Sequence, residues 1–422
     1  MLAIGIDWAT RTHVAVLMTK PGEVLARVTF DDTYEGYLHL LDRIRAYAAE
    51  LKTDEVAFAI ERKDLRLVDF LLANNFTGYL IDPNRMEGYR LRYCSSGAKS
   101  DDRDSFVLAD VLMKDRDQLT PIKTESDAIQ RLKMLLADRA GFVTDKVVMT
   151  GRLQTCLREY YPAALELFAD VTGLTALAFL EAYPTLERTK NLDDQTLRDF
   201  LKAHHALTRK RMQSMLAALV KPAIPVPAVI VEVKHKTMLG LVAQLQAVQK
   251  IIDRCDADIR AALAENPETK RFDGLPGAGP IVSGTLYVIF GDDRTRFVNA
   301  DEVQSYVGTA PRTIQSGESR LVGFRFRCHR DYRAVITRWA FSSLRQAQWA
   351  RRYYNQKRRE GKTHYHALRC LANTLLKIAF TIWKHQTEYD ENRYLAQIAR
   401  HRMSNDSLAD IRGHFQPPTQ EA

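Results

Sequence analysis

Residues 1–30 read MLAIGIDWATRTHVAVLMTKPGEVLARVTF and contain three short runs of apolar and β-branched residues, separated by turn residues. The runs cover residues 2–7, 12–18 and 23–30, and their composition predicts three successive strands. Residues 34–51 then carry apolar side chains at helical spacing, which predicts a helix after the third strand. The chain therefore begins with a strand–strand–strand–helix unit.

Strands and helices continue to alternate up to about residue 115. Residues 55–61 and 77–81 predict two further strands, and residues 65–74 and 101–114 predict two further helices. Three strands, a helix, and then strand, helix, strand and helix is the element order of a ribonuclease-H-like fold. We therefore predict an α/β fold of this type here, although fold order alone says little about function.

The rest of the chain predicts mainly helices. One long helix is expected over residues 126–161, and a smaller helical segment over residues 172–208. After a proline-rich break at residues 221–227, apolar residues recur from Leu241 to Ile259 at alternating spacings of four and three, which is typical of a coiled coil. Such a helix could pack inside its own subunit or join two subunits, and the spacing favours neither.

These patterns divide the chain into four predicted parts, of which the second and third are mainly α-helical. They are the α/β domain at residues 1–118, a helical and coiled-coil assembly region with a small helical insert at 119–270, a C-terminal domain at 271–402 and a polar tail at 403–422.

The composition argues against several classes of protein. With 422 residues, 46% of them hydrophobic and 27% charged, the chain is not disordered or collagen-like. Its five cysteines are scattered without a CxxC pair, which fits a reducing cytoplasm better than a disulfide framework or a zinc site. No window approaches the roughly 18 apolar residues of a membrane span, and the N-terminus does not resemble a signal peptide. We therefore expect a cytoplasmic protein with no membrane partner.

The positive charge is concentrated near the C-terminus. The chain holds 61 Lys and Arg against 52 Asp and Glu, and residues 320–400 alone hold 18 of the basic and 5 of the acidic residues. Such a block favours binding of nucleic acid, RNA or DNA, although a solvated helix face is the alternative. Its densest part interleaves tyrosines with cations, which suits phosphate contact and base stacking. The cations there are Arg351, Arg352, Lys357, Arg358 and Arg359.

Four carboxylates stand where separate elements could bring them together. Asp7 ends the first predicted strand, and Glu61 ends the fourth. Asp101 and Asp104 share one face of a helix because they are three residues apart, whereas Asp102 points elsewhere. Hard cations such as Mg²⁺ or Mn²⁺ take oxygen ligands, and a two-metal phosphoryl-transfer site needs carboxylates from separate elements. The alternative for the aspartate pair is a helix N-terminal cap.

Motifs around these carboxylates resemble one family. They are Gly5-Ile6-Asp7, the strand ending in Glu61, Asp82-Pro83, and AKSDDRD at residues 98–104 with Leu108-Ala109. They resemble the DEDD transposases of insertion sequences, and within them the insertion-sequence-110 type, the bridge-RNA-guided serine recombinases. The resemblance implies a RuvC-like domain whose Mg²⁺-binding tetrad is Asp7, Glu61, Asp101 and Asp104. The chain departs from the family pattern at residues 62–64, where small residues are usual, and at Ser100, where threonine is usual.

A second group of motifs resembles the C-terminal transposase domain of the same family. FGDD at residues 290–293, Arg296-Phe297, residues 306–312 and residues 315–317 follow one another at family-like spacing. The resemblance implies that Ser316 is the nucleophile that attacks a DNA phosphodiester, whereas a Ser-Gly pair without this context is usually only a turn. Arg312, in the third of these motifs, is counted with the predicted nucleic-acid-binding residues.

Residues 275–283, LPGAGPIVS, read as a glycine hairpin between two helices. Gly277 and Gly279 would let backbone N–H groups approach a phosphate closely, as in a helix-hairpin-helix motif. A plain interhelical turn is an equally good interpretation.

The resemblance implies a DNA transposase, a site-directed recombinase that cuts and rejoins DNA by metal-assisted serine attack. Its implied partners are donor and target DNA, a structured non-coding bridge RNA, and further copies of the chain in a homo-oligomer, a tetramer. One alternative is a DNA invertase or Holliday-junction-type nuclease that uses the same carboxylates with water as nucleophile. Another is a nucleic-acid-binding protein without catalytic activity.

Overall fold

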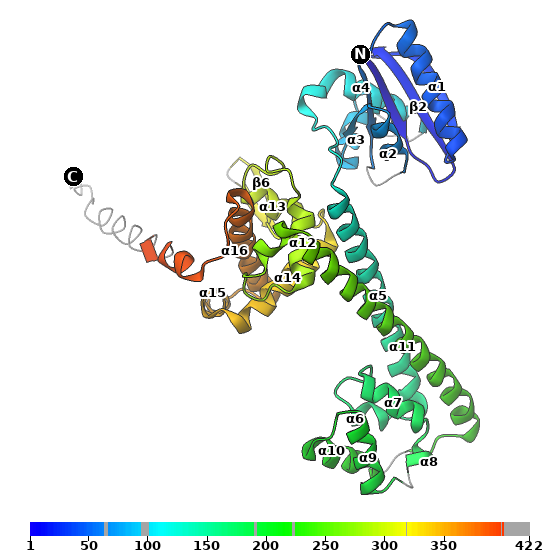
Figure 1. Cartoon of the computed structure of the whole chain (residues 1–422), viewed down its shortest axis with the longest axis vertical. Helices are drawn as coiled ribbons and strands as arrows, with labels where there is room; N and C mark the ends of the chain where they lie inside the picture. The colour runs from blue at the N-terminus through cyan, green and yellow to red at the C-terminus, as the bar shows by residue number, and fades with distance from the viewer. Residues whose placement is uncertain are drawn as a thin grey trace, which may run out of the picture. The chain divides into compact units, whose positions relative to one another are not determined.

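The computed structural model describes residues 1–62, 66–93, 101–189, 192–221, 224–317, 319–397 and 399–400. The chain divides into two compact units, residues 1–124 and residues 125–422 (Figure 1). Each unit has hydrophobic clusters of its own. The predicted polar tail at residues 403–422 lies outside the described residues.

A five-stranded sheet forms the centre of the N-terminal unit. Its strands are β1 (Leu2–Asp7), β2 (Thr12–Lys20), β3 (Glu23–Asp31), β4 (Val56–Ile60) and β5 (Thr77–Leu80). The spatial order is β3-β2-β1-β4-β5, with β1, β2 and β3 antiparallel to one another in turn, and with β4 and β5 running parallel to β1. The predicted mixed α/β N-terminal domain is thereby confirmed.

Helices cover both faces of this sheet. Helices α1 (Tyr34–Glu50) and α2 (Arg66–Ala73) pack on the face that carries Leu2, Ile4 and Ile6 of β1. Helices α3 (Pro83–Arg90) and α4 (Asp101–Asp115) contribute to a cluster on the opposite face, where Ala3, Ala57 and Ala59 lie. Successive side chains of a strand point to opposite faces, so small residues on this second face let α4 come close.

Gly5 brings β1 and α4 together. A Cβ atom added at Gly5 would lie 2.0 Å from the carbonyl oxygen of Ser105 and 2.3 Å from the backbone nitrogen of Ala109. No other residue fits there without displacing the helix, because both contacts are with backbone atoms. The close approach holds the first turns of α4 beside the end of β1.

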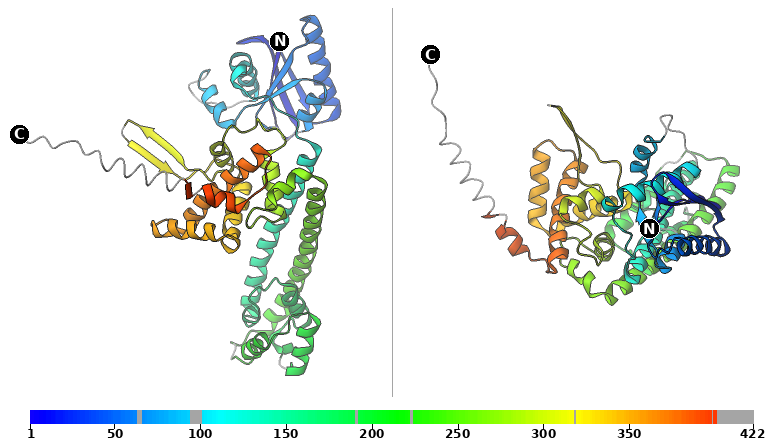
Figure 2. Two further views of the ribbon diagram at one scale, coloured as in Figure 1. Left: turned by 60° about the vertical axis from the view of Figure 1, so that its left-hand side comes forward. Right: turned by 90° about the horizontal axis from the view of Figure 1, so that it is seen from above.

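The C-terminal unit begins with a helical hairpin made of α5 (Asp127–Tyr160) and α11 (Ala228–Glu265), which lie side by side (Figures 1 and 2). Arg139 of α5 pairs with Asp256 of α11, and further along the hairpin Lys146 donates to Gln249 at 2.7 Å. The two helices are therefore antiparallel. The heptad residues Leu241, Leu245, Val248, Ile252 and Ile259 are buried in the same chain. Of the two alternatives for this helix, packing inside its own subunit is the one observed.

A small helical insert joins the far ends of this hairpin (Figure 1). It comprises α6 (Ala164–Leu167), α7 (Leu174–Ala182), α8 (Leu186–Thr189), α9 (Asp194–Ala203) and α10 (Arg209–Leu219). Asp193 caps α9 by accepting a 2.7 Å hydrogen bond from the N–H of Thr196. Phe179, Leu197 and Met215 belong to the insert's own buried cluster.

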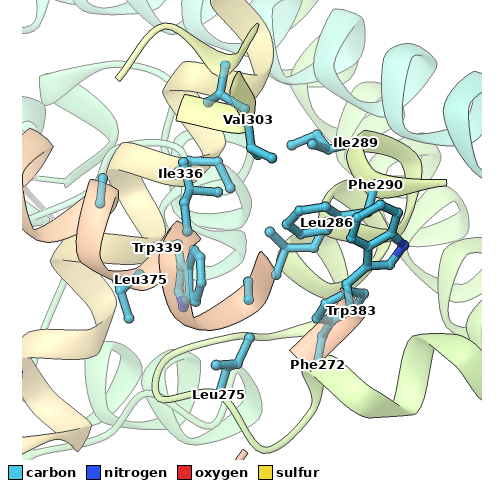
Figure 3. Close-up of a cluster of buried hydrophobic side chains, with 14 of the residues drawn as sticks. Phe272, Leu275, Leu286, Ile289, Phe290, Val303, Ile336, Trp339, Leu375 and Trp383 are labelled. Carbon is cyan, nitrogen blue, oxygen red and sulfur yellow. The ribbon is translucent and has the colours of Figure 1, made fainter. Parts of the chain in front are cut away.

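The last part of the C-terminal unit packs around two tryptophans (Figure 3). Its elements are η2 (Pro267–Phe272), α12 (Pro280–Phe290), α13 (Ala300–Val307), β6 (Arg312–Ser316), β7 (Ser319–Gly323), α14 (Arg330–Gln346), α15 (Gln348–Arg359) and α16 (His364–His385). Trp383 stacks on Phe290, with ring centroids 5.2 Å apart, and Trp339 donates to the carbonyl of Pro276 at 3.0 Å. The mainly helical prediction for this region is correct, apart from the β6–β7 hairpin, which extends away from the helices (Figure 2).

None of the helices in the described ranges is both long and apolar enough to cross a membrane. Cys156, Cys255, Cys328 and Cys370 are free cysteines, and Cys94 lies outside the described residues.

Candidate active site

The first two predicted carboxylates lie at neighbouring strand ends. Ile6 of β1 is paired with Ile60 of β4 in parallel register, so Asp7 and Glu61, the next residues, lie side by side at the carboxyl edge of the sheet. Both belong to the alternate set of side chains that faces α4 rather than α1.

The third predicted carboxylate comes from the first turn of α4. Asp104 is fully buried, although aspartate is almost never buried without a partner. Asp101 begins the same helix, and its side chain lies outside what the structure describes. Asp102 is 64% exposed and forms an ion pair of 3.4 Å with Arg27.

Arg90, at the end of α3, holds the site together. Its Nε donates to Oδ1 of Asp104 at 2.6 Å, and its Nη2 donates to the other oxygen of Asp104 at 2.8 Å and to Oε1 of Glu61 at 3.2 Å. The hydrogen bond with Asp104 raises the pKa of Arg90, and the charges of Asp104, Glu61 and Asp7 act in the same direction. Three of the four predicted carboxylates therefore surround one permanently charged guanidinium.

The sequence analysis missed Arg90. It lies 14 residues before Asp104, in a stretch without apolar periodicity, and only the packing of α3 against α4 brings it to the carboxylates. A buried carboxylate needs a cation or several hydrogen bonds, so a cationic partner for the carboxylates could have been expected on physical grounds.

A second cation lies at the edge of the site. The residues directly after the two strand-end carboxylates are Trp8 and Arg62, and the guanidinium carbon of Arg62 lies 4.7 Å from the centre of the Trp8 ring. This cation–π contact links the ends of β1 and β4. It occurs where the chain departs from the small residues that the resemblance led us to expect.

The donor chemistry of this site suits a hard divalent cation, since every acidic ligand offers oxygen. Within the described ranges, no group of three or more His, Cys, Asp or Glu side chains is placed to hold a metal ion. Arg90 lies between Asp104 and Glu61 and compensates part of their negative charge.

Ser316 lies in the other unit, at the end of an exposed hairpin. It is the last residue of β6, it is paired with Ser319 of β7, and Gly317 next to it has a φ of +56°. Arg312 begins the same strand and is also exposed. Ser316 and Arg312 therefore lie on one short hairpin of the C-terminal unit, whereas the carboxylates belong to the N-terminal unit.

The predicted glycine hairpin is a tight contact with α14. Gly277 has a φ of +76°, and a Cβ added there would lie 2.6 Å from the backbone nitrogen of Ser343. Its N–H already donates to Oε1 of Gln346 at 2.6 Å. Gly279 has open space around it and precedes Pro280, the first residue of α12. The close contact of Gly277 with α14 accounts for a glycine at this position, and no bound phosphate is needed to explain it.

The densest cations occupy α15. Arg351, Arg352, Arg358 and Arg359 are exposed, and Lys357 is paired with Glu360 at 2.9 Å. The tyrosines interleaved with them behave differently, since Tyr353 and Tyr354 are half-buried against the core of the unit. Tyr354 also shares a 2.7 Å hydrogen bond with His364. The side chains that α15 exposes to solvent are therefore mainly charged, and its tyrosines are less accessible.

Two known families match this chain. Residues 4–162, which include all four predicted carboxylates, match the DEDD transposase family of IS110. Residues 269–355, which include Ser316, match the family described as "Transposase IS116/IS110/IS902 family".

Whole-chain relatives agree with these matches. The chain is 30% identical to the "Mini-circle putative transposase for IS117" of Streptomyces coelicolor, over 93% of this chain and 96% of that protein. It is 26% identical to "Insertion element IS116 uncharacterized 44.8 kDa protein" of Streptomyces clavuligerus, over 90% of this chain and 94% of the relative. DEDD transposases generally use divalent metal ions, and a transposase acts on DNA. The chain therefore belongs to the IS110 family of DEDD transposases, which are enzymes.

Proposed function

We propose that this transposase cuts and rejoins DNA with a carboxylate site in its N-terminal unit and with Ser316 as nucleophile in its C-terminal unit. The observation that carries the proposal is the cluster around Arg90, to which the end of β1, the residue after β4 and the first turn of α4 each contribute a carboxylate. The strand order β3-β2-β1-β4-β5 supports a ribonuclease-H-like, RuvC-like domain. In such a domain the carboxyl ends of β1 and β4 are where a phosphodiester would be held.

Asp7, Glu61, Asp101 and Asp104 are the residues that would hold Mg²⁺, or Mn²⁺ in its place. The fit rests on the all-oxygen donor set and on the fully buried Asp104, whose charge demands a cation. When bound, a divalent ion neutralises negative charge on a phosphate and on the oxygens entering and leaving it. Arg90 would then give up its contacts with Asp104 and Glu61.

Ser316 supplies the reacting hydroxyl in this proposal. Its Oγ bonds to phosphorus, the bond from phosphorus to one bridging DNA oxygen breaks, and the serine proton ends on that leaving oxygen. The phosphoserine ester keeps the energy of the cut bond, so a free DNA hydroxyl can reverse the step with another strand and release Ser316. No external energy source is required for rejoining.

Guidance by a structured bridge RNA, action as a tetramer and a cytoplasmic location complete the proposal. The basic residues of α15 support nucleic-acid binding of either kind, together with Arg312 on the hairpin. Recombination cuts four strands, so several copies of the site are needed in one complex. We also propose domain boundaries at residues 118, 270 and 402.

A water nucleophile is the second candidate, because the carboxylate cluster is built by the N-terminal unit alone. The two mechanisms differ in whether DNA becomes attached to protein. The test uses the full-length protein, a supercoiled plasmid that carries the insertion element with its non-coding flanks, and RNA transcribed from those flanks. The reaction is stopped with detergent, digested, and analysed by mass spectrometry for nucleotide-modified peptides.

We expect a nucleotide adduct on the peptide containing Ser316, and none in Ser316→Ala. Ser319→Ala is the matched control, since Ser319 is the cross-strand partner on the same exposed hairpin, and it should form the adduct normally. Recombination by Ser316→Ala without any adduct would reject the serine mechanism in favour of water.

A further inference from the structure

An open cavity of about 620 Å³ lies between α14 and α16 of the C-terminal unit. Nothing in the function proposed above uses it. Four of its lining side chains are arginines, namely Arg330, Arg333, Arg338 and Arg369, and no Asp or Glu is among the lining residues. This cavity, called here the arginine–aromatic pocket, therefore concentrates positive charge without a carboxylate to balance it.

The arginines gather here because of helical spacing. Arg333 and Arg338 lie three and eight residues after Arg330 along α14, which puts each of them within a quarter turn of Arg330, and α16 packs beside that face. Burial lowers the pKa of Arg369, and the neighbouring charge of Arg333 acts in the same direction. Burial and repulsion between like charges both disfavour the charged arginines, and no carboxylate lines the pocket to offset this. Such a site suits an anionic ligand.

Aromatic rings line the same pocket. The ring of Phe324 has the guanidinium of Arg333 at 4.6 Å and that of Arg369 at 4.8 Å from its centre. Phe341 and Tyr365 are 45% and 67% exposed, so flat apolar surface remains accessible beside the charges. This distinguishes the pocket from α15, where the tyrosines pack inward.

The pocket also adjoins the base of the hairpin that carries Ser316. Phe324 directly follows β7, and Arg333 donates to the carbonyl of Arg325 at 2.7 Å. Arg325 in turn donates to the carbonyls of Ala310 and Pro311, just before β6. A ligand in the pocket would therefore contact the residues that anchor both strands of the hairpin.

We propose that the arginine–aromatic pocket binds one unpaired nucleotide of a nucleic-acid strand, with its phosphate on the arginines and its base against Phe341 and Tyr365. This inference rests on the proposed nucleic-acid function. A cavity of this size lies within the range that small-molecule sites have. In a duplex the bases are stacked inside the helix, so a duplex can offer the pocket phosphates but no base.

The test measures binding of fluorescent oligonucleotides to the full-length protein by anisotropy at one fixed salt concentration. The probes are a 15-nucleotide oligo(dT), the matching oligo(U), an abasic strand of the same length, and a 15-base-pair DNA duplex. The variants are Tyr365→Ala and Phe341→Leu, which remove stacking surface from exposed positions. The controls are Tyr34→Ala, which alters an exposed tyrosine of the other unit, and Lys377→Gln, which alters an exposed cation of α16 outside the pocket.

We expect each pocket variant to bind the single strands about 10-fold more weakly than wild type, the decrease typical of one stacked base. Affinity for the abasic strand and for the duplex should stay unchanged, as should all affinities of the controls. Comparison of oligo(dT) with oligo(U) shows whether the pocket prefers DNA or RNA.

Equal decreases for single strand and duplex would overturn the proposal in favour of a general backbone contact, and so would unchanged affinities for every probe. Wild-type protein that binds none of the four probes would instead reject the proposed nucleic-acid function itself.

Discussion

The two parts of the proposed catalytic machinery differ in how firmly the fold holds them. Asp104 is fully buried and receives two hydrogen bonds from Arg90, which also reaches Glu61. Ser316 lies on a hairpin whose ten strand residues are all exposed. The core fixes the carboxylates before any ligand arrives, whereas an exposed hairpin takes its working position from what it binds.

This difference implies that substitutions act differently in the two regions. In the carboxylate site, even a change of one atom disturbs charges that are paired in a buried place. On the hairpin, only Ser316, which performs the chemistry, and Arg312, which is proposed to bind nucleic acid, should matter, and the other residues should tolerate change.

The largest effect is expected for Asp104→Asn, which keeps the shape of the side chain and removes its charge. Removal of one ligand to a divalent ion should cost several kcal/mol of transition-state stabilisation, a decrease of about 100-fold or more in strand exchange. Binding of DNA should persist, because the basic residues of α15 belong to the other unit. Product formation in Mg²⁺ and DNA affinity by anisotropy are the two measurements.

Asp102→Asn is the matched control on the same helix turn, since Asp102 faces Arg27 and solvent. It should recombine DNA at the wild-type rate. Full activity of Asp104→Asn would show that the buried carboxylate is not needed for catalysis. The contrast between the carboxylate site and the hairpin would then no longer hold.

The sequence predicted the strand framework well because burial leaves a strong pattern there. β1 and β4 are continuous apolar runs, and Asp7 and Glu61 are the first acidic residues at their ends. Parallel neighbours end at one sheet edge, so their proximity could be expected from topology alone. The heptad spacing likewise predicted a long helix but not its partner, since α5 of the same chain and a second subunit offer the same kind of apolar face.

Other features leave no such pattern. The β6–β7 hairpin has no buried face, so its residues do not alternate between apolar and polar. Arg90 reaches the carboxylates through the packing of α3 against α4, and the arginine–aromatic pocket lies between α14 and α16. Spacing along one helix can place residues on a face, but it does not say which other helix lies opposite.

The next largest effect is expected on stability. It tests whether the segment around Gly277 in the C-terminal unit is packed as firmly as the carboxylate site. Gly277→Ala places a Cβ against the backbone of α14 at a φ of +76°, so we expect it to lower the free energy of unfolding by about 2 kcal/mol or more. Gly279→Ala adds a Cβ in open space and should leave stability unchanged. Thermal unfolding measures both.

The two glycine variants also separate packing from phosphate binding. If the segment held a phosphate as a helix-hairpin-helix does, Gly279→Ala would weaken DNA binding while leaving the melting temperature unchanged. Equal stability of both variants would contradict the packing role of Gly277.

A smaller effect is expected on the exposed cations of the C-terminal unit. Replacing Arg351 and Arg352 together by Gln should lower the slope of log affinity against log salt by about two, one for each phosphate that the variant no longer neutralises. Lys377→Gln is the control for charge alone. A slope unchanged in the double variant would make α15 a solvated face, which was the alternative for this basic stretch.

The smallest effect is expected for Arg90→Gln, and it tests whether the guanidinium competes with metal for the carboxylates. Removing a positive charge that contacts Asp104 and Glu61 should favour binding of a divalent ion by on the order of 1 kcal/mol, or about fivefold. The variant should be less stable without metal, because Asp104 stays buried and loses its cation. An ion that binds only the folded state raises the melting temperature, so titration with Mn²⁺ reports the half-saturating concentration without any DNA or activity.

Arg62→Gln is the matched control, since Arg62 contacts Trp8 at the edge of the site. It should shift the half-saturating concentration less than Arg90→Gln does. If Arg90→Gln left Mn²⁺ binding unchanged and instead slowed recombination, Arg90 would act on the DNA phosphate rather than as a stand-in for metal. The carboxylate site would then be complete only with both Arg90 and the ion in place.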